Sequence, residues 1–348
     1  MNLARVDRLL NATRRVLAGP GPSGSEQVCS RQSQAYRRAS VLVRMFYLLS
    51  FVLACGDAHA VLMRARVQQW DPLWPLFWLE YIEPNRVVGQ CFAAGLILAA
   101  MLAAICPRPR WTRGLVFLAL FLFCAFENSF GKIAHSRFCL MLISGIFVGL
   151  PAIVRGERAS RLERQRYVLV FGGGQALFLL TYSMAGIGKL LAAGVQMMAG
   201  DIHVFSPTAL SLHIAARLLQ TNESSVLGAW MIAHPGVGQA AMLVTLYLQT
   251  FAFVAAFRPA CHFGWAVGLM GFHVMSELTM GIGFWPNVIL LALLFFWSPF
   301  RGAPGGSPSW PLWGDLWSWL RGGKNVSARP RVDSAHGRHV RAALAARH

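Results

Sequence analysis

The sequence places a lysine among apolar residues, where its chemistry would be unusual. Lys189 lies near the end of an apolar run that begins at Tyr167. An ionisable group inside a membrane-spanning segment costs roughly 3 kcal/mol on insertion scales, so such groups usually have a partner or a function. The chain has 32 lysines and arginines, of which only Lys132, Lys189 and Lys324 are lysines. Because a desolvated lysine can lose its proton and an arginine effectively cannot, Lys189 is a candidate base.

Lys189 also has a structural interpretation. A lysine in the last turn of a spanning helix can extend its ammonium group to the membrane surface. It can also form an ion pair with an acidic residue of another helix, and Asp57 and Glu277 are candidates for that role. The sequence leaves both interpretations open.

Four further polar residues occur in or beside apolar segments: Asp57, His135, His273 and Glu277. His273 and Glu277 are four positions apart, so they share one helical face. With the topology proposed below, Asp57, His135, Glu277 and Lys189 fall toward the outer leaflet and His273 lies near mid-membrane, which predicts a polar cavity open to the extracytoplasmic side. Two histidines and a carboxylate can bind a metal, but their spacing matches no common metal motif, so we predict no metal site.

Length and composition indicate a membrane protein. The chain has 348 residues, of which 55% are hydrophobic and 13% charged, whereas soluble domains average about 25% charged residues. The formal net charge is +18, but the basic residues occur in short blocks between apolar segments and in the two tails. This distribution is typical of polytopic membrane proteins. Because nucleic-acid-binding signatures are absent, we exclude that class and expect membrane lipids as partners.

Common motifs of soluble enzymes are missing as well. The seven cysteines show neither a CxxC pair nor a Cys/His metal spacing. The chain contains no GxSxG elbow, Walker A loop or dinucleotide-binding fingerprint. We interpret 172–174, three consecutive glycines, as a site of close helix packing rather than a phosphate-binding loop.

The elements that must position these residues are apolar helices. We predict an all-α integral membrane protein, a polytopic bundle of about eight transmembrane helices (between about six and nine), several of them short or broken. The basic blocks 107–113, 155–166 and 258–262 then all face the cytoplasm, which places both termini there and the protein in the plasma (inner) membrane. The predicted spans are Val41–Met63, Val87–Ile105, Gly114–Glu127, Phe138–Val154, Tyr167–Leu190, Ala240–Phe257, Phe263–Gly281 and Pro286–Trp297.

The predicted organisation has three parts. Residues 1–40 form a basic cytoplasmic tail, residues 41–300 the transmembrane domain, and residues 301–348 a basic, Pro/Gly-rich tail that we expect to be disordered. Residues 194–235 contain one arginine and no lysine, which predicts an extracytoplasmic loop with an amphipathic helix at 209–219. Because both tails are basic, a lipid-binding scaffold is a further interpretation.

Three stretches carry the candidate residues in order along the chain. The first is Ala134-His-Ser-Arg-Phe-Cys-Leu-Met-Leu-Ile143. The second is Tyr182-Ser-Met-Ala-Gly-Ile-Gly-Lys-Leu190. The third is Phe272-His-Val-Met-Ser-Glu-Leu-Thr-Met-Gly-Ile-Gly-Phe-Trp-Pro286. Together they resemble the HTTM family, the membrane domain shared with vitamin K-dependent gamma-carboxylase, over residues 40–300.

The resemblance implies a chemistry. In the carboxylase, the lysine at the position of Lys189 deprotonates vitamin K hydroquinone, and the histidine at the position of His135 assists it. By resemblance, this chain would be a carboxylase- or epoxidase-like enzyme, with Lys189 and His135 as catalytic residues and a reduced quinone, such as vitamin K hydroquinone, as its lipid-soluble cofactor or substrate. A dry, apolar site would shield the proton transfer from water. The expected substrate-binding residues are Tyr182, His273, Glu277 and Asp57.

The sequence departs from the family pattern in several places. Met197–Gly200 stands where the family has a tryptophan and a glycine, and Gln249 stands where a glutamate is common. A basic tail occupies the place of the carboxylase's large luminal region, so we expect quinol oxidation or epoxidation rather than glutamyl carboxylation. The competing function is non-enzymatic: a partner subunit, or a transporter of a small amphipathic molecule, with Lys189 in a structural ion pair.

Overall fold

The computed structural model of the chain describes residues 25–63, 70–81, 86–130, 135–152, 159–300 and 311. Every regular element in these residues is helical and none is a strand, which confirms the all-α prediction. All the helices lie in one compact unit, Met1–Ser307. They are α2 (Ser25–Met63), η1 (Phe77–Tyr81), α3 (Arg86–Ile105), α4 (Arg110–Asn128), η2 (His135–Arg137), α5 (Phe138–Val148), α6 (Arg161–Ala199), α7 (Ala209–Thr221), α8 (Val226–Ala233), α9 (Pro235–Thr250), α10 (Ala252–Ala256), η3 (Pro259–Cys261), α11 (His262–Met280), α12 (Trp285–Leu291) and the π-helical η4 (Ala292–Phe296).

Fewer helices than predicted are long and apolar enough to cross a membrane. Within the described part of the chain there are four, in α2, α3, α4 and α6, and a fifth if α8 and α9 count as one span bent by 103°. By this criterion the predicted number of about eight is too high. The segment His135–Val148 and the segment Trp285–Phe296 are apolar but short. In α11, polar residues such as His262, His273 and Glu277 interrupt the apolar sequence.

Several helices extend beyond the apolar segments that predicted them. α2 begins at Ser25, inside the predicted tail 1–40, and α4 begins at Arg110, so the third predicted helix is not short. α6 begins inside the arginine-rich block 155–166, because Ser160 and Glu163 form a capping box: each side chain accepts a hydrogen bond from the other's backbone N–H, at 3.2 and 2.7 Å. Residues 1–24 of the first predicted tail, and residues 301–348 except Pro311, lie outside the described residues.

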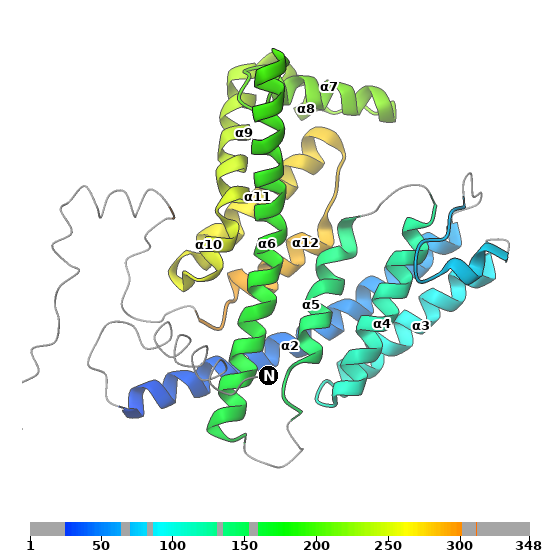
Figure 1. Cartoon of the computed structure of the whole chain (residues 1–348), viewed down its shortest axis with the longest axis vertical. Helices are drawn as coiled ribbons and strands as arrows, with labels where there is room; N and C mark the ends of the chain where they lie inside the picture. The colour runs from blue at the N-terminus through cyan, green and yellow to red at the C-terminus, as the bar shows by residue number, and fades with distance from the viewer. Residues whose placement is uncertain are drawn as a thin grey trace, which may run out of the picture. The chain divides into compact units, whose positions relative to one another are not determined.

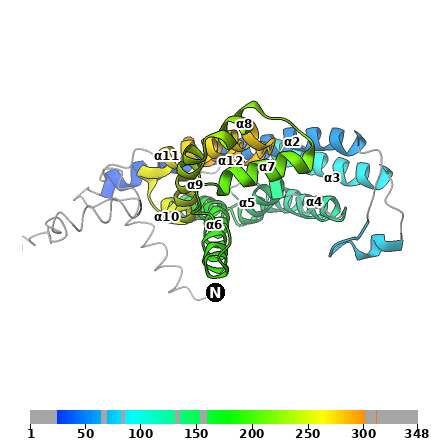
Figure 2. The same ribbon diagram turned by 90° about the horizontal axis from the view of Figure 1, so that it is seen from above.

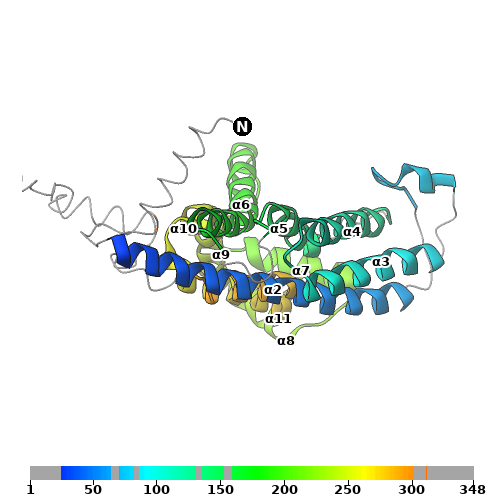
Figure 3. The same cartoon turned by 90° about the horizontal axis from the view of Figure 1, so that it is seen from below.

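α6 is the helix around which the others are arranged. Figure 1 shows α9 beside its C-terminal half, with α7 and α8 at that end, while α2 crosses nearer its N-terminal half. In Figure 2, where α6 is seen nearly end-on, α5 and α10 lie on opposite sides of it. Figure 3 shows α2 running alongside α3. The rings of Tyr36 in α2 and Tyr167 in α6 meet edge-to-face, with centroids 5.2 Å apart.

The core is aromatic and closely packed. Phe147 of α5 stacks on Phe171 of α6 with ring centroids 5.8 Å apart. A Cβ atom at Gly174 would lie 2.9 Å from the Phe147 ring, so this glycine permits the approach of the two helices. The glycine run at 172–174 therefore serves helix packing, as the sequence predicted.

Candidate functional site

Helix α6 presents a narrow face toward α9 and α11. Tyr182, Gly186 and Lys189 are spaced by four and three residues, so they lie on one side of the helix. Tyr182 and Gly186 are buried, while Lys189 is partly exposed. The helix continues past Lys189 for ten residues to Ala199, and Gly200 ends it with a left-handed backbone (φ 75°). Lys189 is therefore held in the body of a helix, not in its last turn as the sequence suggested.

The contact between α6 and α9 is close because it occurs at a glycine. A Cβ atom at Gly186 would lie 2.6 Å from the backbone nitrogen of Thr250. Ser183, one turn earlier, donates a hydrogen bond to the Thr250 carbonyl at 3.0 Å and accepts one from the Phe253 N–H at 2.8 Å. The Ser183 hydroxyl thus bonds across the break between α9 and α10, where the helical hydrogen-bond ladder is interrupted.

This contact gives Lys189 its partner. The ammonium nitrogen Nζ of Lys189 donates to Oε1 of the Gln249 side chain at 2.8 Å, and Gln249 is buried. The structure gives Lys189 no carboxylate partner among the described residues. An amide oxygen accepts a hydrogen bond from either an ammonium group or a neutral amine, so this contact is compatible with both forms of the lysine.

A second polar pair lies deeper in the bundle. The Tyr182 hydroxyl is 2.6 Å from Nε2 of His273 on α11, and both residues are buried. The other ring nitrogen of His273, Nδ1, is buried without a hydrogen-bond partner. The imidazole also contacts the Phe284 ring, with centroids 5.5 Å apart. The pair links α6 to α11 on the face that carries Lys189.

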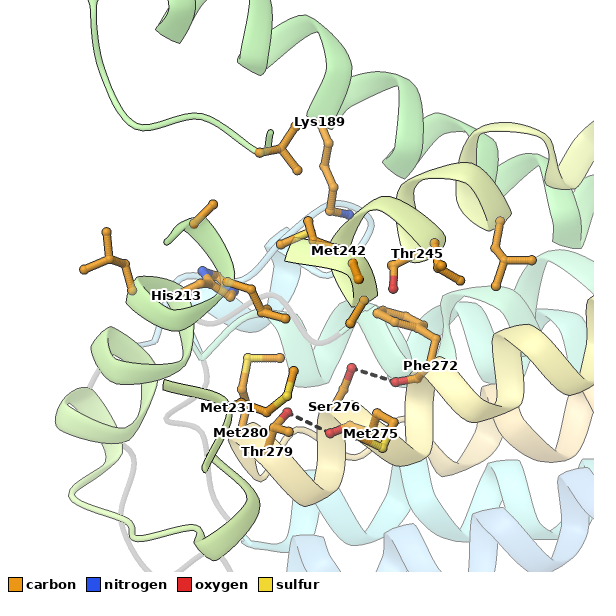
Figure 4. Close-up of a pocket in the computed structure, with 18 of the residues that line it drawn as sticks. Lys189, His213, Met231, Met242, Thr245, Phe272, Met275, Ser276, Thr279 and Met280 are labelled. Carbon is orange, nitrogen blue, oxygen red and sulfur yellow. Dashed lines mark hydrogen bonds between the residues drawn. The ribbon is translucent and has the colours of Figure 1, made fainter. Parts of the chain in front are cut away.

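Lys189 borders a large, mainly apolar cavity between α6, α7, α9 and α11. The cavity has a volume of about 1100 Å³. Figure 4 shows the Lys189 side chain extending toward Met242 of α9, with His213 of α7 at another side of the cavity. Met231 and Met280 form part of the opposite wall. Flexible, polarisable methionines adapt to ligands of different shape, so this wall suits an apolar molecule.

Few polar groups face this cavity. Ser276 and Thr279 line it, but their hydroxyls donate to the carbonyls of Phe272 and Met275 within α11, at 2.9 and 2.7 Å (Figure 4). The other polar side chains of the wall are Thr245 of α9 and, toward the C-terminal end of α6 and in the segments that follow it, Lys189, Gln196, His203 and His213. A ligand that matches this distribution has an apolar body and one polar end able to accept hydrogen bonds.

The structure brings together some of the predicted site residues and separates others. Lys189 lines the cavity, whereas Tyr182 and His273 pair behind its wall. His135 is exposed in η2, where its ring contacts Phe138 at 5.7 Å, and no hydrogen bond joins it to Lys189. It does not line the cavity.

Of the two predicted acidic residues, only Glu277 has a described side chain, and it does not contact Lys189. Glu277 lies one turn after His273, as predicted, but its buried Oε2 atom has no hydrogen-bond partner and it does not line the cavity. Asp57 falls within α2, and its side chain lies outside the described residues. Within the described chain no group of three or more His, Cys, Asp or Glu residues could hold a metal ion.

Sequence reasoning missed three residues of the site. Gln249 was noticed only as a departure from a family pattern, and its role as the partner of Lys189 depends on how α9 ends. His203 and His213 lie in the segment predicted as an extracytoplasmic loop. The amphipathic helix predicted at 209–219 is present as α7, and its histidine on the cavity side was the available signal.

The Tyr182–His273 bond makes a testable contribution to stability. Tyr182→Phe leaves both nitrogens of the buried imidazole without a partner, so we expect it to lower the free energy of unfolding by about 1–2 kcal/mol. Tyr47→Phe is the matched control, because the Tyr47 hydroxyl is buried without a hydrogen-bond partner and its removal should be neutral or stabilising. Denaturant unfolding in detergent micelles measures both. Equal changes in the two variants would contradict the assignment.

Comparisons with known proteins give no match: no protein-family model, no curated protein and no solved structure matches this chain. The resemblance to the HTTM family therefore rests on the three sequence motifs, and its functional implications are taken up as a proposal.

Proposed function

We propose that this chain is a multi-pass membrane protein of the HTTM class that binds a lipid-soluble quinol in the cavity between α6, α7, α9 and α11 and uses Lys189 as the base that deprotonates it. The observation that supports the proposal is the position of Lys189, which borders an apolar cavity of about 1100 Å³ and is hydrogen-bonded to a neutral amide, Gln249. A cavity of this kind accommodates an isoprenoid or ring body, and its few polar groups can bind a hydroxyl.

The membrane topology is part of the proposal. Each of the eight apolar segments identified in the sequence overlaps at least one helix of the described residues, although only four or five are long and apolar enough to span on their own. We propose that the short helices complete the bundle against the long ones, with both termini at the cytoplasmic face of the plasma (inner) membrane. The distribution of arginine between the predicted loops supports this orientation.

The proposed chemistry begins with proton transfer from a quinol hydroxyl to the neutral amine of Lys189. The phenolate that forms then reacts with O₂, which is the oxidant: one quinol and one O₂ give one quinone epoxide and one water. Gln249 orients the lysine through its Oε1 atom and remains unchanged. His135 is the assisting residue by resemblance, whereas His213 is the histidine that lines the cavity and is a second candidate for proton transfer.

The competing interpretation, Lys189 in a structural ion pair, has less support. The contact of Lys189 is with Gln249, and its two predicted acidic partners do not provide a carboxylate: the described Glu277 makes no contact with it, and the side chain of Asp57 lies outside the described residues. A structural cation would usually be expected beside an anion in an apolar setting.

Turnover of reduced quinones by purified protein in nanodiscs tests the proposal. Lys189→Arg keeps a cation and a hydrogen-bond donor beside Gln249 but cannot act as a base. We expect it to reduce turnover by about 10²–10⁴-fold, the contribution of general acid–base catalysis, at an unchanged melting temperature. Lys189→Met should lose turnover to the same extent.

Binding is measured in the same samples through the ligand-dependent rise in melting temperature. If a quinone stabilises wild type and Lys189→Arg alike, while only wild type turns over quinol, the result supports both quinone binding in the cavity and the role of Lys189 as the base. Retained turnover in Lys189→Arg would exclude Lys189 as the base. Absence of wild-type turnover with every quinol tested, together with lower melting of both variants, would assign the lysine a structural role in a non-enzymatic protein.

A further inference from the structure

A second concave site lies between α2 and the end of η4, apart from the cavity beside Lys189. It is an open groove of about 500 Å³. Two arginines and two apolar residues of α2 form one wall, and the last residue of η4 with the two residues that follow it form the other. The lining residues are Arg37, Arg38, Val41, Leu42, Phe296, Trp297 and Ser298.

The α2 wall changes from charged to apolar within one helical turn. Arg37 and Arg38 are exposed, and Val41 and Leu42 follow them by four residues each, so the same stretch of helix presents first guanidinium groups and then aliphatic side chains. Val41 is 57% exposed and marks the start of the apolar segment. This order matches an amphiphile with an anionic head and an apolar tail.

The opposite wall has an unusual backbone. Residues Ala292–Phe296 form a π-helical turn, and the Trp297 N–H donates to the Ala292 carbonyl at 3.1 Å. Such turns are rare and frequently occur at functional sites, because they change which residues face a neighbouring helix. Here Trp297 lines the groove and remains 60% exposed. Tryptophan is enriched at membrane–water interfaces, where its ring packs among lipid headgroups.

The base of the groove is fixed by buried polar contacts. Ser298 lies 2.8 Å from Nδ1 of His262 and 3.4 Å from Nε2 of Gln175, oxygen to nitrogen. His262 Nε2 is 3.0 Å from the Ala256 carbonyl oxygen. These contacts join α6, α10 and α11 to the segment that ends in Ser298, so the groove is a preformed feature of the bundle.

The residue that precedes the two groove arginines has mainly basic neighbours. The phenol of Tyr36, next to Arg37 in α2, lies within electrostatic range of Arg44, Arg108 and Arg164. Glu163 is the one acidic residue among these neighbours. A cluster of arginines over a low-dielectric bundle creates a positive potential that attracts anions.

We propose that this groove binds an anionic membrane phospholipid, with its phosphate held by Arg37 and Arg38 and its acyl chain lying along Val41, Leu42 and Trp297. Guanidinium groups form bidentate, charge-assisted hydrogen bonds with phosphate oxygens, which favours arginine at such sites. The apolar continuation of the groove selects a lipid over a soluble phosphate. This site is independent of the function proposed for the cavity beside Lys189.

Lipid titration of the purified full-length protein in detergent tests the proposal, with retained lipid counted by native mass spectrometry. The probes are phosphatidylglycerol, phosphatidylcholine and inorganic phosphate. We expect phosphatidylglycerol to bind wild type and to raise its melting temperature. Arg37→Gln/Arg38→Gln should weaken this binding roughly 20-fold, because each arginine near a lipid surface contributes about 1 kcal/mol.

Arg161→Gln/Arg166→Gln is the matched control, since it removes the same charge from exposed arginines that do not line the groove. It should change the affinity by less than about two-fold in buffer with physiological salt. An equal loss of phosphatidylglycerol affinity in the two double variants would show that the lipid is held by diffuse electrostatic attraction and not by the groove. A similar response to phosphatidylcholine, or to inorganic phosphate, would also overturn the proposal. The single variants Arg37→Gln and Arg38→Gln decide the case if the double variant does not fold.

Discussion

Glu127→Ala is expected to lower the free energy of unfolding by about 3–5 kcal/mol, the largest effect of a single substitution that the structure predicts. Glu127 is in the last turn of α4, and its side chain is 4% exposed. Nη1 of Arg137, in η2, donates to Oε2 of Glu127 in an ion pair. Removal of the carboxylate takes away the anion that offsets the desolvation of the Arg137 guanidinium group.

A double-mutant cycle isolates the pair. Arg137→Ala should also be strongly destabilising, because it leaves Glu127 as a buried anion. Glu127→Ala/Arg137→Ala should lose much less stability than the sum of the two single losses, since neither charge is then buried without the other. Denaturant unfolding in micelles measures the four proteins.

Additive losses in the double variant would show that the two charges do not stabilise each other.

The pair also has a functional consequence, because η2 carries His135, the proposed assistant of Lys189. We therefore expect Glu127→Ala to disturb any contribution of His135 to turnover. The guanidinium of Arg137 lies 5.5 Å from the centroid of the Phe123 ring, which gives the cation a further favourable contact in wild type.

The helices could be predicted from the sequence because the apolar segments are bounded by basic or Gly/Pro-rich residues. Their ends could not, because caps and not hydropathy determine them. The capping box of Ser160 and Glu163 starts α6 inside an arginine-rich block that reads as a loop. Hydropathy also led us to predict full membrane spans for helices that are short or interrupted by polar residues, such as α11.

The candidate site could be predicted only in part. Lys189 and His273 stood out because ionisable residues are rare in apolar segments. Tyr182 was expected in the site only through the family resemblance, and Gln249 was noted only as a departure from it, since the roles of both depend on how α6 meets α9 and α11. His273 and Glu277 do lie one turn apart in α11, but the His273 imidazole forms its hydrogen bond with Tyr182 of α6. The spacing of residues along the sequence shows which of them share a face of one helix, but it does not show which other helix packs against that face.

Two glycines of α6 give the sharpest test of how the site is positioned. Gly186→Ala places a methyl group 2.6 Å from the Thr250 nitrogen, a backbone atom that cannot move without displacing α9. Gly188→Ala, two residues later, meets nothing within 4 Å. Overpacking costs about 1–3 kcal/mol, whereas alanine in an open helical position stabilises by about 0.5–1 kcal/mol relative to glycine. The two variants should therefore differ by about 1.5–4 kcal/mol in unfolding free energy.

The same pair of variants connects packing to the proposed chemistry. Displacement of α9 at Thr250 also moves Gln249, which precedes it and accepts the hydrogen bond of Lys189 at 2.8 Å. Gly186→Ala should therefore reduce both stability and quinone binding, while Gly188→Ala retains both. Thermal unfolding and ligand-induced stabilisation in nanodiscs measure the two properties on the same samples. If Gly186→Ala were as stable as Gly188→Ala, the close contact of α6 and α9 would be disproved. If it were destabilised and yet bound quinone normally, the position of Lys189 would not depend on that contact.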